Sequence, residues 1–375
     1  KIVHLCPRGF WPGFIVGLIY FSYIFSWLWS LYPLEAFGIS SGFYSFLGIS
    51  LVFSISVAGM TIFWGIFSLL IFKLSRNTKL IFIPPLVGSI FVLTEYARAW
   101  GFGFLWLGSG SLLGPHWTLG SPAYLMASWP FILKISSIWG IYGIDFLLIW
   151  TISTIFLLLI GKYSINSRAV FLNLGLIILI FSLTIGFSTK KSSTQTSLDT
   201  IKVSLIQTKD PTRLKLSSDE VIDSYTKKLE MIKEAANATS GGIVIFPETS
   251  NFSRTLSNFL DAASVKEYFN KLSNKELTII DNNILPDQGG YKSRTLFIDS
   301  KNGISGFYDK QLLTPMGEYT PHILRLLLFI MRKNDFISEN SGLKTGAHPE
   351  LLNHKGYPIK ILVCSDILSP NISHK

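Results

Sequence analysis

Long apolar stretches in the first half of the chain restrict this sequence to a membrane-embedded architecture. A helix that crosses a bilayer needs about 20 predominantly apolar residues. The second stretch is longer than one straight span requires, so its helix is expected to tilt or to extend past the membrane. The stretches predict about five spanning helices within residues 1–189, near 13–32, 43–72, 80–100, 138–160 and 169–187.

The charged residues gather in the other half of the chain. Up to residue 188 there are nine Lys or Arg and three acidic residues, whereas 24 Lys or Arg and 20 acidic residues follow. Charged residues make up only 15% of the chain, against about 25% in a typical soluble protein. The net charge of +10 is spread out without a basic run, which argues against a nucleic-acid partner. The composition therefore predicts a membrane domain followed by a globular domain.

The segment between the third and fourth stretches, residues 101–137, differs from the spans. It is rich in glycine and proline, and it carries Trp106, Trp117 and Trp129. Irregular backbone is tolerated at membrane depth only against protein or water, and tryptophan is typical of the headgroup level. We therefore expect a re-entrant or interfacial loop here, with these three tryptophans at the headgroup level.

The positive charges of the connecting loops predict the orientation in the membrane. Seven Lys or Arg lie on the side of the amino end, and only Arg98 and Lys134 lie on the opposite side. Loops rich in Lys and Arg stay in the cytoplasm. Five spans then place the globular domain outside the cytoplasm.

Residues 201–375 have the pattern of an α/β domain, preceded by a Ser/Thr-rich linker at 190–200. Strand-like runs alternate with helix-like segments, and this alternation predicts a layered α/β domain. Helices are expected over 217–236, where Asp219 and Glu220 suit the first turn, and over 255–273. The expected strands are 201–208, 242–246, 277–280, 295–298, 304–308 and 359–363.

Three reactive side chains stand at the ends of these strands, namely Glu248, Lys310 and Cys364. The carboxyl ends of strands are where ligand sites form in α/β sheets. A thiol must lose its proton before it attacks, and a carboxylate can accept that proton. An ammonium group favours the thiolate and can hold the oxyanion that forms on the attacked carbonyl. Each residue alone is more often structural, as a core cysteine, a turn glutamate or a surface lysine, so only the combination indicates a site.

The sequence context of these residues resembles a known family. Glu248 ends Phe-Pro-Glu, Lys310 opens a stretch that runs Lys-Gln-Leu-Leu-Thr-Pro-Met-Gly-Glu-Tyr-Thr-Pro to residue 321, and Cys364 lies in Val-Cys-Ser-Asp. The order resembles the Glu–Lys–Cys pattern of the nitrilase superfamily. The Lys310 stretch is similar to the Lys…Leu-x-Pro-x-Gly-Glu-x-x-Pro motif of apolipoprotein N-acyltransferases. Residues 95–98 and 140–146 of the membrane half are similar to the same family.

The resemblance implies a multi-pass α-helical membrane domain followed by a nitrilase-like αββα sandwich. It implies an enzyme of the bacterial inner membrane, with the catalytic domain on the periplasmic side. Cys364 would accept an acyl chain from a phospholipid as a thioester, and the α-amine of a diacylglyceryl-cysteine apolipoprotein would then receive it. Glu248 would be the general base and Lys310 the oxyanion stabiliser, with Glu318 and Asp366 in support. Neither a metal ion nor an organic cofactor is expected.

The chain also departs from the family pattern. Ser365 and Asp366 stand where the family has Tyr-Glu after the nucleophile, and Lys292 stands where it tends to have Asn. The family continues beyond both ends of this sequence, so we expect a fragment whose catalytic domain is truncated at its C-terminal end. Two alternatives remain. One is a membrane-tethered amidase in which water is the acceptor, and the other is an inactive homologue that binds lipoprotein or lipid, which Ser365 and Asp366 would favour.

Overall fold

The protein consists of two compact units. The first, here called the membrane unit, comprises Lys1–Glu35, Ile39–Leu105 and Leu113–Ser197, and the second, the sheet unit, comprises Ala36–Gly38, Trp106–Leu112 and Leu198–Lys375. The computed structural model describes residues 9–37, 39, 41–160, 167–192, 200–209, 217–239, 241–272, 276–287, 290–330, 342–346, 352–354 and 356–373.

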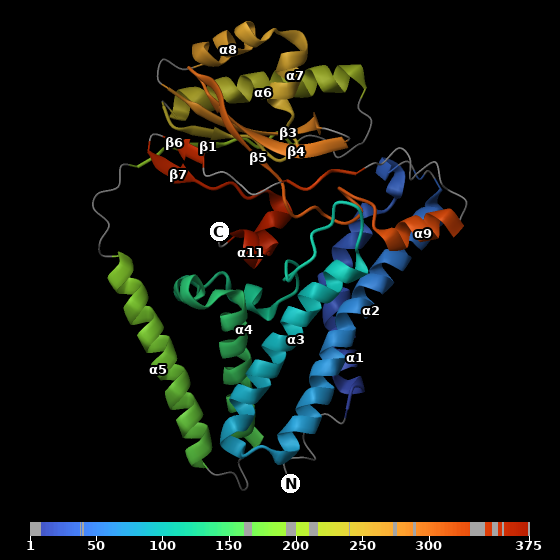
Figure 1. The fold of residues 1–375 in the computed structure, drawn as a ribbon, viewed down its shortest axis with the longest axis vertical. Helices are drawn as coiled ribbons and strands as arrows, with labels where there is room; N and C mark the ends of the chain where they lie inside the picture. Colours follow the sequence, from blue (N-terminus) through green and yellow to red (C-terminus); the bar gives the residue numbers. More distant parts are fainter. Residues whose placement is uncertain are drawn as a thin grey trace. The chain divides into compact units, whose positions relative to one another are not determined.

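Five helical segments of the membrane unit are long and apolar enough to cross a membrane. This confirms the expected number of spans within the described residues and supports a multi-pass membrane protein. The first segment continues from α1 through the 3-10 turn η2 (Ser26–Leu31). Figure 1 shows the helices in blue to green: α1 (Trp11–Ile24), α2 (Gly42–Leu74), α3 (Ile83–Leu105), α4 (Pro130–Ile160) and α5 (Ser167–Ser192).

The predicted re-entrant loop is shorter than 101–137, because helices occupy both of its ends. The α3 helix runs on to Leu105 and α4 already begins at Pro130, with a kink at Gly140, where φ is 63°. Of the three tryptophans expected at the headgroup level, Trp106 and Trp117 are buried inside the protein. Trp129 is exposed.

Three charged side chains of the spanning helices, Glu95, Arg98 and Asp145, are buried and hydrogen-bonded. The Arg98 guanidinium lies 2.6 Å from the Glu95 carboxylate and donates to the carbonyl oxygen of Leu119 at 2.8 Å. The Asp145 carboxylate accepts hydrogen bonds from the Ser121 hydroxyl at 2.7 Å and the backbone N–H of Ala123 at 2.9 Å. Ionisable groups in membrane helices are expensive unless they find such partners. Both clusters therefore hold the loop before η6 (Pro122–Met126) against the helices.

The sheet unit contains a five-stranded mixed sheet with the strands in chain order. Strands β1, β2 and β3 are parallel, whereas β4 is antiparallel to both β3 and β5. A second sheet pairs β6 (Leu352–His354) with β7 (Tyr357–Ile359). The strands of the large sheet are β1 (Val203–Leu205), β2 (Ile243–Ile245), β3 (Thr278–Asp287), β4 (Gly290–Asp299) and β5 (Gly303–Asp309).

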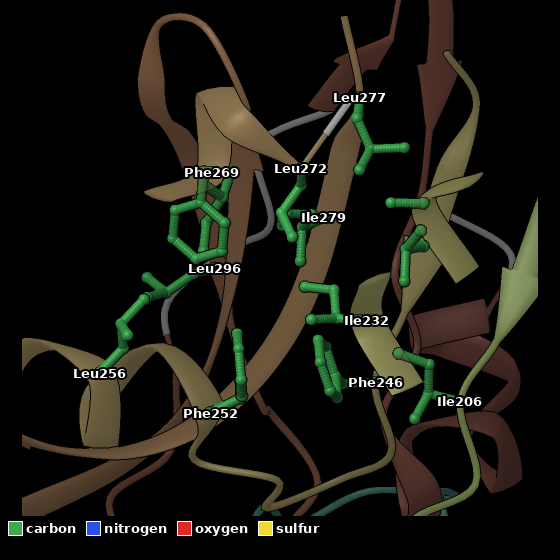
Figure 2. Packing of buried hydrophobic residues seen from close by; sticks show 13 residues of the cluster. Ile206, Ile232, Phe246, Phe252, Leu256, Phe269, Leu272, Leu277, Ile279 and Leu296 are labelled. Atoms are coloured by element: carbon green, nitrogen blue, oxygen red, sulfur yellow. The ribbon is translucent and has the colours of Figure 1, made fainter. Parts of the chain in front are cut away.

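Helices cover one face of the large sheet and the small sheet covers the other (Figure 1). On the helical face, Ile232 of α6 and Phe252 of α7 pack with Ile279 of β3 (Figure 2). Val244 of β2 belongs to the same buried cluster. On the other face, Phe297 packs with Leu352 of β6. Burying apolar side chains on both faces is what stabilises such layers. The helices of the sheet unit are α6 (Ser218–Thr239), α7 (Phe252–Phe259), α8 (Ala262–Lys271), α9 (His322–Ile330) and the short α11 (Pro370–Ser373).

The structure corrects two expected elements. The helix expected over 255–273 is divided in two, because Asp261 caps the start of α8 by accepting from the Ser264 N–H at 2.7 Å. The strand expected over 359–363 is also wrong, since β7 ends at Ile359 and Cys364 begins a 3-10 turn, η8 (Cys364–Leu368). The linker predicted at 190–200 falls mostly outside the described residues, and α5 extends to Ser192.

Candidate active site

The topology of the large sheet brings two of the predicted site residues to one edge. Strands β2 and β5 run in the same direction. Strand β2 is parallel to β3, and β3 and β5 are both antiparallel to β4. Glu248 lies three residues beyond β2, and Lys310 directly follows β5. Both side chains therefore leave the sheet at the carboxyl ends of its strands, as expected for a ligand site.

Lys310 is the centre of the site. Its side chain is almost fully buried, and its ammonium nitrogen lies 2.8 Å from Oε1 of Glu248 and 2.9 Å from Oε1 of Glu318. Its backbone is fixed as well, since its N–H donates to Ser293 and its carbonyl accepts from Gly346. A buried ammonium needs such partners, and two carboxylates supply them.

The turn that carries Glu248 is shaped by its neighbours. Thr249 and Asn251 adopt left-handed backbone conformations, with φ of 55° and 50°. Asn282 in β3 holds this turn from both sides: its Oδ1 accepts from the Thr249 N–H at 2.8 Å, and its backbone carbonyl accepts from the Asn251 N–H at 3.0 Å. Beside it, the buried Asp281 carboxylate accepts from the Ser250 hydroxyl. The position of Glu248 is thus set by polar residues inside the sheet.

Cys364 reaches the same place on the turn η8. Its backbone is in the left-handed region, with φ of 48°, and its side chain is exposed. A non-glycine residue there costs free energy and is more common at functional sites. The Glu248 carboxylate lies close to the thiol, and the charges of Lys310, Glu248 and Glu318 all act on it. The structure therefore brings together all three predicted reactive groups.

The local electrostatics keep the thiol protonated and the lysine charged. Although the Cys364 side chain reaches the surface, the protein groups around it remove part of the water from the thiol, and this desolvation is the main effect that raises its pKa above the ordinary value. The Lys310 charge lowers the pKa, and the Glu248 and Glu318 carboxylates raise it further. Burial lowers the pKa of the Lys310 ammonium, but the Glu318 and Glu248 carboxylates outweigh it, so the net shift is upward. A thiol held in its protonated form needs a base before it can attack a substrate, and the Glu248 carboxylate is near enough to act on it.

Glu318 and Asp366, the two supporting residues, lie in different places. Glu318 contacts Lys310 directly, and its second oxygen accepts from the Thr314 N–H at 2.7 Å. Asp366 is fully buried beneath the Cys364 turn and accepts from the Tyr308 hydroxyl at 2.6 Å and the Leu312 N–H at 2.7 Å. Asp366 thus ties the turn of the nucleophile to the segments on both sides of Lys310.

Ser365 and Lys292, which also depart from the expected family pattern, both make contacts near Lys310. The Ser365 hydroxyl is buried and donates to the carbonyl oxygen of Leu312. Lys292 pairs with the Asp287 carboxylate at 2.7 Å, and more distantly, at 3.5 Å, with Asp309, the residue before Lys310. Both residues support the segment around Lys310 by contacts with its backbone or its neighbour.

Sequence reasoning missed the residues that orient the site, namely Asn282, Tyr308 and Thr314. Asn282 could have been found, because Asp281, Asn282 and Asn283 interrupt an otherwise apolar run in β3. Buried polar residues in a strand require hydrogen-bond partners. The positioning roles of the Tyr308 hydroxyl and the Thr314 N–H have no comparable signal in the sequence.

The site contains the elements of nucleophilic acyl chemistry: a thiol, a carboxylate in contact with it, and an ammonium next to both. Within the described part of the chain, no group of three His, Cys, Asp or Glu residues is arranged to hold a metal ion. Comparison with known proteins gave no match to a family model or to a curated sequence.

Proposed function

We propose that this chain is an N-acyltransferase of the apolipoprotein type, acting on lipids from within a membrane. The observation that carries the proposal is the Lys310 ammonium, held 2.8 Å and 2.9 Å from two carboxylates beside the Cys364 thiol. Five membrane-spanning segments in the same chain favour a lipid substrate over a soluble one.

In the first half-reaction, Glu248 takes the proton of Cys364 as the sulfur attacks the ester carbonyl of a phospholipid. The Lys310 ammonium stabilises the oxyanion of the tetrahedral intermediate. When the carbon–oxygen bond to the glycerol breaks, Glu248 returns the proton to the leaving oxygen. A lysophospholipid departs, and the acyl chain remains on Cys364 as a thioester.

In the second half-reaction, the α-amine of a diacylglyceryl-cysteine apolipoprotein attacks the thioester carbonyl. Glu248 accepts a proton from the amine, the carbon–sulfur bond breaks, and the proton returns to the Cys364 sulfur. The amide product and the free enzyme result. The cycle needs no metal ion or organic cofactor.

We assign the sheet unit to the nitrilase-like αββα class as part of this proposal. Three successive layers support the assignment: helices α6 to α8, the five-stranded sheet, and the β6–β7 sheet on its other face. The positions of Glu248 and Lys310 after β2 and β5 also suit that class.

The test is capture of the thioester in membranes that contain the chain. With an alkyne-bearing fatty acid in the phospholipids, the wild-type chain and Cys6→Ser should acquire a hydroxylamine-sensitive label, and Cys364→Ala should not. Equal labelling of Cys364→Ala would contradict the proposal. Labelled wild type that releases free fatty acid, but never acylates a diacylglyceryl peptide, would favour the amidase. Unlabelled wild type would favour the inactive homologue.

The proposal also places the sheet unit on the periplasmic side of a bacterial inner membrane, on the strength of the loop charges. A reporter that is active only in the periplasm should be active when fused near Ser193. It should be silent when fused near Asn77, in the short basic loop after α2. The reverse result would show that the orientation is inverted.

A further inference from the structure

A short segment between two spanning helices is built into the sheet unit. Residues Trp106–Leu112 follow directly on α3, yet they cluster with the sheet unit and not with the membrane unit. Gly108 forms an antiparallel bridge with Pro321, and the His322 N–H donates to the Leu107 carbonyl at 2.7 Å. This segment, which we call the α3 extension, is thus paired like a short strand with the backbone just beyond Glu318.

Tyr319 is the main point of contact between the α3 extension and the candidate site. It follows Glu318 directly, it is buried, and its hydroxyl donates to the Trp106 carbonyl at 2.8 Å. Trp106 itself is completely buried. The Tyr319 side chain is held by its bond to Trp106, and the backbone after it is held by the bridge between Gly108 and Pro321. These contacts also restrict the backbone of the preceding residue, Glu318.

Gly108 is the tightest position of this contact. A Cβ atom there would lie 2.8 Å from Cδ2 of Tyr319 and 2.9 Å from the carbonyl oxygen of Thr320. Both distances are shorter than packed atoms tolerate, and the second involves backbone, so Tyr319 and its neighbours would have to move. Any such movement passes directly to Glu318, whose carboxylate lies 2.9 Å from the Lys310 ammonium.

We propose that the α3 extension is a positioning element of the candidate active site, acting through Tyr319 to hold Glu318 against Lys310. Gly108 is then required for the geometry of a site to which it contributes no reactive group. The inference rests on the proposed role of the Glu248, Lys310 and Cys364 cluster. It adds that the α3 extension, within the sheet unit, keeps Glu318 in place beside that cluster.

Cys364 offers a readout of Glu318 that does not depend on catalysis. Three charged groups act on its thiol: Lys310 after β5, Glu248 after β2, and Glu318 in the following loop. The Glu318 carboxylate raises the pKa of the thiol and also neutralises the Lys310 charge that lowers it. Moving Glu318 away should therefore lower the pKa of Cys364.

The experiment is the pH dependence of Cys364 alkylation by iodoacetamide, in the full chain in membranes and in a Cys6→Ser background, where no other thiol exists. Gly108→Ala and Glu318→Gln should both move the alkylation midpoint to lower pH. The double variant should show no more than the larger single shift, since both changes act through one carboxylate. Acyl transfer by Gly108→Ala should fall by about 10²-fold, the cost of a misplacement of about 1 Å.

Two further variants keep the test decisive. Tyr319→Phe removes only the hydrogen bond to Trp106, so it should shift the midpoint in the same direction by less, even if Gly108→Ala fails to fold. Gly175→Ala in α5, where a Cβ would meet nothing within 4 Å, should match the parent. Unchanged midpoints in Gly108→Ala and Tyr319→Phe, or in Glu318→Gln, would overturn the inference, as would additive shifts in the double variant. Because alkylation needs no acyl donor, failure of the acyltransferase proposal leaves this test intact.

Discussion

The membrane unit and the sheet unit each contain a buried cation paired with carboxylate, but only one of these clusters opens to the surface. Arg98 and Glu95 in α3 are both buried, and the guanidinium also contacts the Leu119 carbonyl and the Met60 sulfur. Lys310 in the sheet unit is equally buried, yet the side chain of its partner Glu248 is 32% exposed. Next to Glu248 lies the exposed Cys364.

Under the proposed function, this difference separates a structural ion pair from a reactive one. In the α3 cluster, bonds to protein groups occupy both charges, so the pair fixes the neighbouring loop and has no open position for a ligand. In the sheet unit, the Glu248 carboxylate lies next to both a buried cation and an accessible thiol, which is the arrangement that the proposed proton transfer requires. Burial alone therefore does not identify a functional charge, whereas an accessible partner does.

The largest expected effect is on catalysis by the cluster of Glu248, Lys310 and Cys364. Glu248→Gln keeps the size of the side chain but removes the base, so thioester formation should fall by about 10²–10⁴-fold. Lys310→Met should lose a comparable factor, because the oxyanion loses its ammonium. Rates of thioester formation from phospholipid vesicles provide the measurement.

The double variant Glu248→Gln with Lys310→Met tests whether the two residues act in one shared site. Since both act on one step, its loss should be far smaller than the product of the single losses. Multiplicative losses would show that the residues act independently, and the idea of one shared site would fail.

Changes to the buried Arg98–Glu95 pair should alter the stability of the protein. Arg98→Met leaves the Glu95 carboxylate buried without its cation, which should cost about 3–5 kcal/mol of folding free energy. Pairing it with Glu95→Gln should recover part of that loss, since no orphaned charge remains. Thermal unfolding in detergent would measure both, with Arg76→Met, at an exposed position, as the control. An Arg98→Met variant as stable as the control would show that the pair does not hold the α3 region together.

Asp366 should behave as a structural carboxylate despite its place two residues after Cys364. It is fully buried and accepts from Tyr308, Leu312, Gln311 and Val363. Asp366→Asn should cost about 1–3 kcal/mol, because an amide cannot accept all of these bonds. Asp366→Glu should cost a similar amount by overpacking. Denaturant unfolding, with the exposed Asp223→Asn as control, would test this, and a more active Asp366→Glu would contradict it.

The smallest effect concerns pH. Lys310 lowers the pKa of the Cys364 thiol and Glu248 raises it. Lys310→Met should therefore move the midpoint of Cys364 alkylation to higher pH, and Glu248→Gln should move it to lower pH. Shifts in the same direction would mean that the two groups do not act on the thiol as opposite charges.

The sequence allowed the spans, most of the strands and the positions of Glu248 and Lys310 after strands to be predicted, because these features depend on local patterns. Apolar runs indicate the spanning helices directly. The residues before Lys310 predict the strand β5, which Lys310 follows. The division of the helix at Asp261 and the place of Trp106–Leu112 in the sheet unit could not be predicted in this way. Both depend on hydrogen bonds, and in the second case these join residues more than 200 positions apart. Asp366 lies close to Cys364 in the sequence, but the groups that it binds, on Tyr308 and Leu312, lie far from it along the chain.

The most direct test of the account is the mass of the Cys364 peptide after the chain has been incubated with phospholipid vesicles. The account predicts an added acyl chain on Cys364, which disappears when a diacylglyceryl peptide is supplied and reappears as an amide on the α-amine of that peptide. Arg98→Met combined with Glu95→Gln, if folded, should still form the adduct, and Glu248→Gln should form far less. Transfer to the peptide while Cys364 stays unmodified, or an acyl chain found on another residue, would contradict the account.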